Sequence, residues 1–373
     1  MFTDFDRMMM ERAIENAYRP LKPPYPNPRV GAVIVRDGKI ISEGFHESYV
    51  HPHAENMALK ALNYRADGAT IYVTLEPCCP FEGKRNPSCA EMLIKAGIAR
   101  VVVAVLHPEP GQDRGMSMLK SAGVQVESGL LENEAEWLLK GLRHFQKTGR
   151  PFVMAKWAMT ADGLIAPASR HPGEISGTEI SILLHKLRHQ MDAVLVGIGT
   201  VLSDNPRLNC RAAGFRHPTR VVVDPDLKTP LWSHVANPTA DMPTIVLCRT
   251  GANPEQKSLL SAQGAEVVEL VADSSGGLRI GEILACLAAR KLYSLLVEGG
   301  SSVHGRFFDE CLVDELLVIV APKVLGGKDG LNPVGGRGRL EIPKAVRLED
   351  FRTEMIGPDI AIRARPIFDQ PPV

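Results

Sequence analysis

Short apolar runs alternate with amphipathic helical segments through the first 145 residues. The segment 6–18 predicts a helix, and apolar runs at 30–35 and 40–45, joined by Asp37-Gly38, predict two strands of a hairpin. Later runs predict strands at 70–74, 100–105 and 124–126, with helices at 53–62, 89–96 and 132–145. This alternation predicts an α/β sandwich in which helices cover a sheet.

The same alternation restarts after a polar segment. Residues 146–151, Gln-Lys-Thr-Gly-Arg-Pro, have the composition of a linker, which predicts one domain at 1–147 and a second at 151–373. Apolar runs predict strands of the second domain at 152–158, 193–197, 220–223, 244–248, 294–298 and 316–320. A chain of 373 residues is also long for one core, so two α/β domains are expected.

Composition narrows the class of protein. Lys plus Arg and Asp plus Glu both number 43, and this balance argues against a surface that coats nucleic acid. No apolar run approaches the roughly 20 residues that span a bilayer, so no membrane association is expected. Seven cysteines without regular spacing fit a reducing cytoplasm better than a disulfide framework.

The strongest chemical signal is a set of metal-ligating residues in the first half. His53 and Glu55 are separated by one residue, Cys78 follows Pro77, and Cys89 lies further along. One imidazole and two thiolates suit Zn²⁺ and leave a fourth position for water, while Glu55 can move protons without binding the metal. The pattern H-x-E…P-C…C is typical of zinc-dependent nucleobase deaminases.

The spacing leaves the identity of one metal ligand undecided. The compact motif is P-C-x-x-C, whereas here Cys79 is a rival to Cys78 and the polar segment 80–88 separates both from Cys89. Cys78 is favoured because it directly follows Pro77. His53 and Cys89 are each expected at the start of a helix, where the positive end of the helix dipole favours thiolate and hydroxide.

Glycine-rich loops follow strands in the second half. Residues 197–208 follow one predicted strand, and Glu298-Gly299-Gly300-Ser301-Ser302 joins another to a helix. Backbone N–H groups at such a junction can approach a phosphate, which makes 298–302 a candidate pyrophosphate cradle or simply a turn. The G-x-G-x-x-G spacing of a Rossmann domain is missing.

These motifs together resemble the bifunctional riboflavin-biosynthesis enzymes that join a pyrimidine deaminase to a reductase. The resemblance runs through nearly the whole chain, in order, and is carried by segments in both halves: 26–35, 44–46, 52–55, 74–78, 156–163, 192–197, 200–208, 297–300 and 321–327. It implies an N-terminal cytidine-deaminase-like three-layer α/β/α domain and a C-terminal dihydrofolate-reductase-like α/β domain.

The resemblance also implies two consecutive reactions. Zinc-dependent deamination of 2,5-diamino-6-(5-phosphoribosylamino)pyrimidin-4-one precedes reduction by NADPH, which converts the ribosyl group to ribityl and gives 5-amino-6-(5-phosphoribitylamino)uracil. The substrate is a small phosphorylated pyrimidine, and a homodimer is expected.

Site residues follow from the resemblance position by position. His53, Cys78 and Cys89 match the zinc ligands and Glu55 the proton carrier. Asn27 and His46 match the pyrimidine pocket. The remaining matches fall in the reductase, with NADPH contacts at Met159, Thr200, Asp204, Gly300, Ser301 and Ser302, and substrate contacts at Arg188, Leu208, Arg211 and Glu298. Arg suits phosphate because its fork binds two oxygens.

Three segments depart from the family pattern. The loop 80–88 is longer and lacks a His, 107–110 reads His-Pro-Glu-Pro, and 172–176 lacks an aromatic residue expected beside the nicotinamide. Glu174 would repel NADPH phosphates if buried, so it is expected to face solvent or pair with an Arg.

Other hypotheses stay open at this point. One is a diverged paralogue with one domain inactive or redirected to another phosphorylated base. Another is a structural zinc or metabolite-binding protein, which predicts a closed four-ligand site that includes Cys79. A nucleic-acid deaminase fits poorly, because no basic or aromatic stripe is present.

Overall fold

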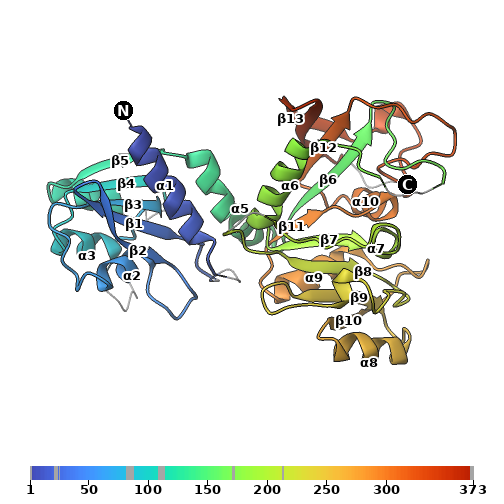
Figure 1. The fold of residues 1–373 in the computed structure, drawn as a ribbon, viewed down its shortest axis with the longest axis horizontal. Helices are drawn as coiled ribbons and strands as arrows, with labels where there is room; N and C mark the ends of the chain where they lie inside the picture. The colour runs from blue at the N-terminus through green and yellow to red at the C-terminus, as the bar shows by residue number, and fades with distance from the viewer. Residues whose placement is uncertain are drawn as a thin grey trace. The chain divides into compact units, whose positions relative to one another are not determined.

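The computed structural model describes residues 2–20, 24, 26–80, 88–107, 114–169, 173–211 and 214–369. The chain divides into two compact units, Met1–Arg143 and His144–Val373 (Figure 1). Within the described residues, none of the helices has both the length and the apolar character needed to cross a membrane.

The first unit is built on a five-stranded sheet. Its strand order is β2-β1-β3-β4-β5, with β1 antiparallel to both neighbours and the other pairs parallel. The strands are β1 Gly31–Arg36, β2 Lys39–Phe45, β3 Thr70–Leu75, β4 Arg100–Val105 and β5 Gln125–Ser128. Parallel pairing brings the carboxyl ends of β3 and β4 to one edge of the sheet.

Helices cover both faces of this sheet. The helices of the first unit are α1 Asp4–Ala17, α2 Ala54–Lys60, α3 Cys89–Lys95 and α4 Gly115–Ser121, and α5 Glu132–Thr148 continues into the second unit. A Cβ at Gly31 would meet α1, whereas one at Gly44 would meet α2. Gly44 pairs with Ala32, the neighbour of Gly31, and successive side chains of a strand point to opposite faces. The unit is therefore a three-layer α/β/α sandwich.

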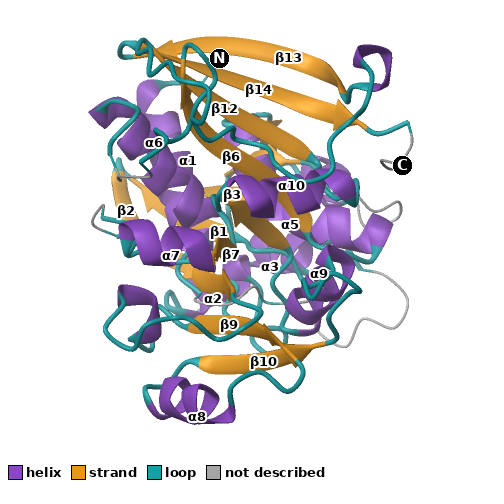
Figure 2. Ribbon diagram, turned by 90° about the vertical axis from the view of Figure 1, so that its right-hand side faces the viewer, coloured by secondary structure: helices purple, strands orange, loops and turns teal. Residues whose placement is uncertain are grey.

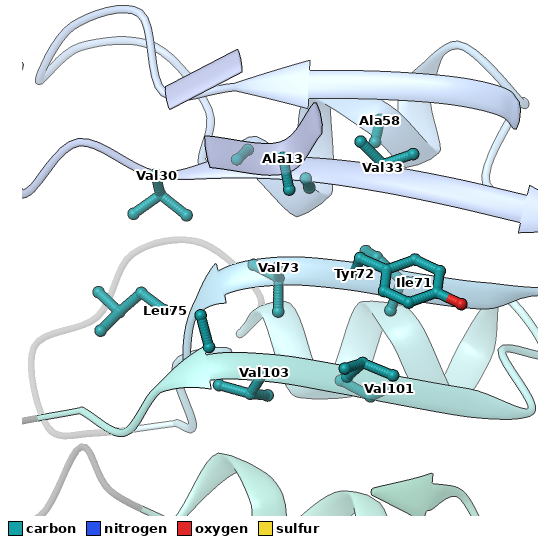
Figure 3. Close-up of a cluster of buried hydrophobic side chains, with 14 of the residues drawn as sticks. Ala13, Val30, Val33, Ala58, Ile71, Tyr72, Val73, Leu75, Val101 and Val103 are labelled. Carbon is teal, nitrogen blue, oxygen red and sulfur yellow. The ribbon is translucent and has the colours of Figure 1, made fainter. Parts of the chain in front are cut away.

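The core of the first unit lies between these layers. Figure 3 shows Val33 of β1, Val73 of β3, and Val101 and Val103 of β4 among its side chains, and all four are fully buried. Strands covered on both faces are expected to carry continuous apolar runs of this kind. The short apolar runs in the sequence are thus explained by burial on two sides.

The second unit contains a nine-stranded sheet. Its order is β10-β9-β8-β7-β11-β6-β12-β14-β13, parallel from β10 to β12 and antiparallel in the last two pairs. Figure 2 shows β12, β14 and β13 side by side. The strands are β6 Phe152–Thr160, β7 Ala193–Gly197, β8 Thr219–Val223, β9 Thr244–Arg249, β10 Glu266–Leu270, β11 Ser294–Val297, β12 Glu315–Ala321, β13 Arg347–Ile356 and β14 Asp359–Ile367.

Helices connect the parallel strands. They are α6 Thr178–Gln190, α7 Ile198–Asp204, α8 Pro254–Ala262, α9 Ile280–Ala289 and α10 Ser301–Asp309, with 3-10 turns η1 His234–Ala236 and η2 Ile342–Lys344. Ile283 and Leu287 of α9 and Phe307 of α10 are fully buried in one apolar cluster with Leu195 of β7 and Leu295 of β11. This packing fixes the start of α10 beside the end of β7.

The predicted strands and helices are confirmed except in the linker, and three strands, β10, β13 and β14, were not predicted from sequence. Helix α5 continues through Thr148, so the first three residues of the predicted linker 146–151 are helical, and this part of the prediction is wrong. Every residue of β13 except Ile356 is exposed, so the strand lacks the apolar run used to find the others.

Candidate functional site

Three predicted metal ligands lie together at the edge of the first sheet. His53 is the N-cap of α2, Cys78 lies beyond the end of β3, and Cys89 is the first residue of α3. His53 Nδ1 lies 3.5 Å from Cys78 Sγ and 3.4 Å from Cys89 Sγ, and the ligand atoms all fall within 4.8 Å of one another. One imidazole and two buried thiols form the donor set that Zn²⁺ prefers.

The rival cysteine does not join this group. Cys79 is buried, but the group of possible metal ligands among the described residues contains Cys78 and not Cys79. The backbone N–H of Cys89 donates to Cys78 Sγ over 3.4 Å, which holds this sulfur beside the start of α3. The geometry therefore favours a three-ligand site rather than a closed four-ligand one.

Glu55 lies in the first turn of α2, two residues after His53. Its side chain is buried, with 3% of the residue exposed, and burial raises the pKa of the Glu55 carboxyl. A buried carboxyl group with a raised pKa takes up a proton more readily than an exposed one, as a general acid and base must. The arrangement is suited to proton transfer beside a metal.

A pocket opens beside the cluster and contains both residues predicted to contact the pyrimidine. It is lined by Asn27, Pro28, Val30, His46, His53, Glu55, Leu75, Glu76, Cys78 and His107. The carboxyl end of β3 and the start of α2 thus contribute metal ligands and pocket wall together. A flat ring bound here would lie beside Glu55, His53 and Cys78 at the same time.

His46 is held in one orientation by two neighbours. Its Nδ1 lies 3.0 Å from the Pro52 carbonyl and its Nε2 lies 3.0 Å from Asn27 Nδ2. A carbonyl can only accept and an amide NH₂ can only donate, so the imidazole carries its proton on Nδ1. Burial lowers the pKa of His46, which agrees with this neutral form.

Sequence reasoning assigned no role to Glu76, which closes one side of the pocket. Its carboxylate accepts from the N–H of His107 at 3.1 Å and from the N–H of Met116 at 2.9 Å, and only 4% of the residue is exposed. These bonds join the end of β3 to the end of β4 and the start of α4. The sequence signal that could have identified Glu76 is its position directly before Pro77 and Cys78.

The predicted cofactor loop lies at the carboxyl ends of β7 and β11. A Cβ at Gly299 would come within 2.8 Å of Val196 Cα, and one at Gly300 within 3.2 Å of Thr200 Oγ1. Gly300 also has φ +68°, and no side chain caps the start of α10. A close backbone approach and an uncapped helix start are suited to a phosphate group.

Two predicted substrate contacts form a buried ion pair. Arg188 donates through Nε and Nη2 to Glu298 at 2.6 and 2.7 Å, and their side chains are only 10% and 9% exposed. Burial disfavours both charges, but the ion pair outweighs burial, so the pKa of Glu298 is lowered and that of Arg188 is raised. Arg188 Nη1 also donates to the Asn209 carbonyl, which ties the segment after Leu208 to the pair.

Two further basic side chains lie near this pair and were not among the predicted site residues. Burial lowers the pKa of Lys156, while the Glu298 carboxylate opposes that effect. Burial also lowers the pKa of His185, and the positive charges of Arg188 and Arg211 lower it further. Lys156 opens the segment 156–163 that carries the family resemblance, whereas nothing in the sequence marked His185.

The other predicted residues lie at the end of β6 or in the segments that follow β7 and β11. Met159 lies near the end of β6, and Asp204 is the exposed last residue of α7. Ser301 and Ser302 begin α10, and Arg211 is exposed. Parts of the three departing segments, 81–87, 108–110 and 172, lie outside the described residues. Glu174 is exposed, as expected, and its carbonyl accepts from Lys323.

Family models match both halves of the chain. The cytidine and deoxycytidylate deaminase zinc-binding region matches residues 3–105, and the RibD C-terminal domain matches residues 151–362. The matches confirm a deaminase-type domain followed by a reductase-type domain.

Riboflavin biosynthesis proteins match this chain over almost its whole length. The chain is 38% identical over 362 residues to the riboflavin biosynthesis protein RibD of Actinobacillus pleuropneumoniae, covering 96% of this chain and 94% of that protein. It is 36% identical over 364 residues to RibD of Aquifex aeolicus, covering 97% and 99%.

Solved structures agree along the whole chain. RibD of Acinetobacter baumannii superposes with a TM-score of 0.69 at 33% identity. A diaminohydroxyphosphoribosylaminopyrimidine deaminase/5-amino-6-(5-phosphoribosylamino)uracil reductase of Thermotoga maritima superposes with a TM-score of 0.70 at 32% identity. Each comparison covers 98% of this chain and 99% of the other.

Proposed function

The chain belongs to the RibD family of riboflavin biosynthesis proteins, and on that premise we propose which residues carry out its two reactions. It is a bifunctional enzyme, a zinc-dependent deaminase and an NADPH-dependent reductase. The substrate is 2,5-diamino-6-(5-phosphoribosylamino)pyrimidin-4-one, and the product of both steps is 5-amino-6-(5-phosphoribitylamino)uracil. Residues 1–147 form the deaminase domain and 151–373 the reductase domain.

His53, Cys78 and Cys89 hold the zinc ion. The single observation that carries this assignment is the convergence of one imidazole and two thiols from three separate segments on one point. Bound zinc supplies the Lewis acidity that makes water nucleophilic at neutral pH. The three protein ligands leave room for that water beside the pocket.

Glu55 moves the protons of the deamination. Its buried carboxylate takes a proton from the attacking water and passes it to the departing amino nitrogen, so that ammonia can leave. Asn27 and His46 position the pyrimidine ring. Because His46 Nε2 accepts from Asn27 Nδ2, the Asn27 carbonyl oxygen is left to accept from the ring.

The reductase residues position the sugar against the cofactor. When bound, NADPH supplies the hydride. Met159, Thr200, Asp204 and the start of α10 from Gly300 to Ser302 hold the dinucleotide. Arg188, Leu208, Arg211 and Glu298 contact the phosphorylated sugar, and the Arg188–Glu298 pair holds both side chains in one geometry before substrate arrives.

The exposed outer strand of the second sheet supports a homodimer. Strand β13 lies at the sheet edge and exposes Leu348, Phe351 and Met355, of which Phe351 is 56% and Met355 64% exposed. An unpaired edge with apolar side chains favours association with a second copy. Light scattering should give a dimer mass for the wild type and a monomer mass for a variant with Phe351→Asp and Met355→Asp. A wild-type monomer would contradict the assignment.

Mass spectrometry of the diaminopyrimidine substrate, with and without NADPH, tests the two reactions. Zinc-loaded enzyme should give deaminated product alone without NADPH, and deaminated and reduced product with it. Glu55→Gln should abolish deamination while zinc stays bound, because the substitution removes the proton carrier and leaves all three ligands. A Glu55→Gln variant that still releases ammonia at the wild-type rate would refute the role of Glu55.

A further inference from the structure

Asn205 connects the two predicted contact regions of the reductase. It follows Asp204, the last residue of the cofactor helix α7, and precedes the segment that carries Leu208 and Arg211. Its backbone is left-handed, with φ 41° and ψ 57°, and its N–H donates to the Val201 carbonyl. Pro206 then prevents the helix from continuing. The chain therefore changes direction at Asn205, between cofactor and sugar contacts.

The Asn205 side chain is bonded to a distant part of the sequence. Its Oδ1 accepts from the N–H of His234 at 2.8 Å. His234 is the first residue of the turn η1, where backbone N–H groups have no partner within the helix. The N-cap residue of that turn, Ser233, makes no side-chain cap and donates instead to the Pro230 carbonyl. Asn205 thus performs the capping that Ser233 does not.

Arg220 anchors the turn η1 to strand β8 of the sheet. This fully buried residue of β8 donates to the carbonyl of His234 at 2.8 Å, and to those of Asn237 and Met242 at 3.3 and 3.2 Å. Arg220 pairs in register with Val194 of β7, the strand that leads directly into α7. Both ends of α7 are therefore fixed to the same pair of strands.

We propose that Asn205 is a positioning residue of the reductase, which holds the end of α7 against η1 so that Thr200 and Asp204 meet NADPH in the reactive geometry. This inference rests on the cofactor contacts of the proposed function. The near contact between Thr200 Oγ1 and the Gly300 position explains why the placement of α7 matters, because it sets the space between that helix and the start of α10. A helix fixed at one end only can pivot away from α10.

The hydrogen bond can be removed from either side. Asn205→Gly removes the acceptor and keeps a residue that adopts positive φ without strain. His234→Pro removes the donor at the first position of a helix, where proline is tolerated. His234→Ala is the matched control, since it removes the same imidazole but keeps the N–H.

The readouts are the Kd for NADPH, measured by its fluorescence, and the KM for NADPH in the reductase assay of the full chain. Loss of one neutral hydrogen bond predicts a roughly three- to tenfold rise in Kd and KM for Asn205→Gly and for His234→Pro. His234→Ala should match the wild type. The double variant Asn205→Gly/His234→Pro should be no worse than either single variant, because both remove the same bond. Ammonia release by the deaminase domain should be unchanged in all four.

Two results would overturn the proposal. One is a wild-type Kd and KM in both single variants, or a fall in melting temperature with no change in NADPH affinity, since a purely structural residue gives that pattern. The other is additivity in the double variant, which would mean that the two residues act separately. A wild-type enzyme that does not bind or oxidise NADPH would instead refute the proposed function itself.

Discussion

A methyl group at Gly44 should damage the zinc site without touching any of its residues. Gly44 lies in β2 under the first turn of α2, and a Cβ there would lie 2.1 Å from the Ala54 carbonyl oxygen and 2.7 Å from the Ala58 nitrogen. Both contacts are with backbone, so no side-chain rotation can relieve them. Restoring an ordinary contact of 3.4 Å requires the helix and strand to separate by about 1.3 Å.

The displaced helix carries the chemistry. His53 is the N-cap of α2 and Glu55 lies in its first turn, so a shift of this size moves the proposed metal ligand and the proposed proton carrier together. Overpacking of this kind destabilises a domain by about 1–3 kcal/mol. A misplacement of about 1 Å can lower the rate by about 100-fold. Gly44→Ala should therefore lose most of its deaminase kcat/KM and part of its zinc affinity.

Gly31 provides the matched control on the opposite face of the sheet. A Cβ at Gly31 would lie 1.9 Å from the Ala13 carbonyl oxygen and 2.6 Å from the Ala17 nitrogen of α1, which carries none of the proposed site residues. Both variants should shift the urea midpoint of the first domain, but only Gly44→Ala should lose bound zinc and ammonia release. Reductase activity in the same protein should stay at the wild-type level. Equal losses of deamination in the two variants, or none in Gly44→Ala, would refute the argument.

Three other perturbations test whether the two sites act independently and which interactions stabilise each domain. A chelator should abolish ammonia release but leave NADPH oxidation on deaminated substrate intact, and a joint loss would contradict independent sites. Asp6→Asn should destabilise the first domain by about 2–3 kcal/mol at pH 7, because Asp6 accepts from Arg100 and Tyr72 at 2.6 and 2.7 Å. Burial alone would raise the pKa of Asp6, but these bonds hold it well below its ordinary value of about 3.9. The carboxylate therefore stabilises the fold above pH ~4 and loses that contribution as pH falls toward the folded pKa. Between these pH values, the free energy of unfolding should fall less steeply for Asp6→Asn than for the wild type. Arg188→Met should leave Glu298 buried without its partner and lower the free energy of unfolding of the second domain, measured in urea, by about 3–5 kcal/mol. A change of less than about 0.5 kcal/mol would show that solvent reaches the pair.

The sequence by itself identified the strands covered on both faces and the residues proposed to bind zinc. Val101 and Val103 belong to an apolar run because helices cover both faces of β4, and that burial leaves a local pattern. His53, Glu55, Cys78 and Cys89 could be selected because zinc chemistry restricts residue types and their order along the chain. Local composition was sufficient in both cases.

Only the tertiary structure decided features that depend on distant contacts. The sequence favours Cys78 because it follows Pro77, but only the fold brings Cys78 Sγ within 3.5 Å of His53 Nδ1. The bonds of Glu76 to the N–H groups of His107 and Met116 depend on the pairing of β3 with β4.

The same is true of the second domain. Residues 110 positions apart form the Arg188–Glu298 pair, and β13 is held in the sheet by pairing with β14 although its side chains are exposed. Asn205 would pass for an ordinary turn residue until its side chain is seen to accept from His234, 29 positions away. A hydrogen bond between distant segments leaves no periodic pattern in either of them. It depends on a single donor and a single acceptor that only the fold brings together.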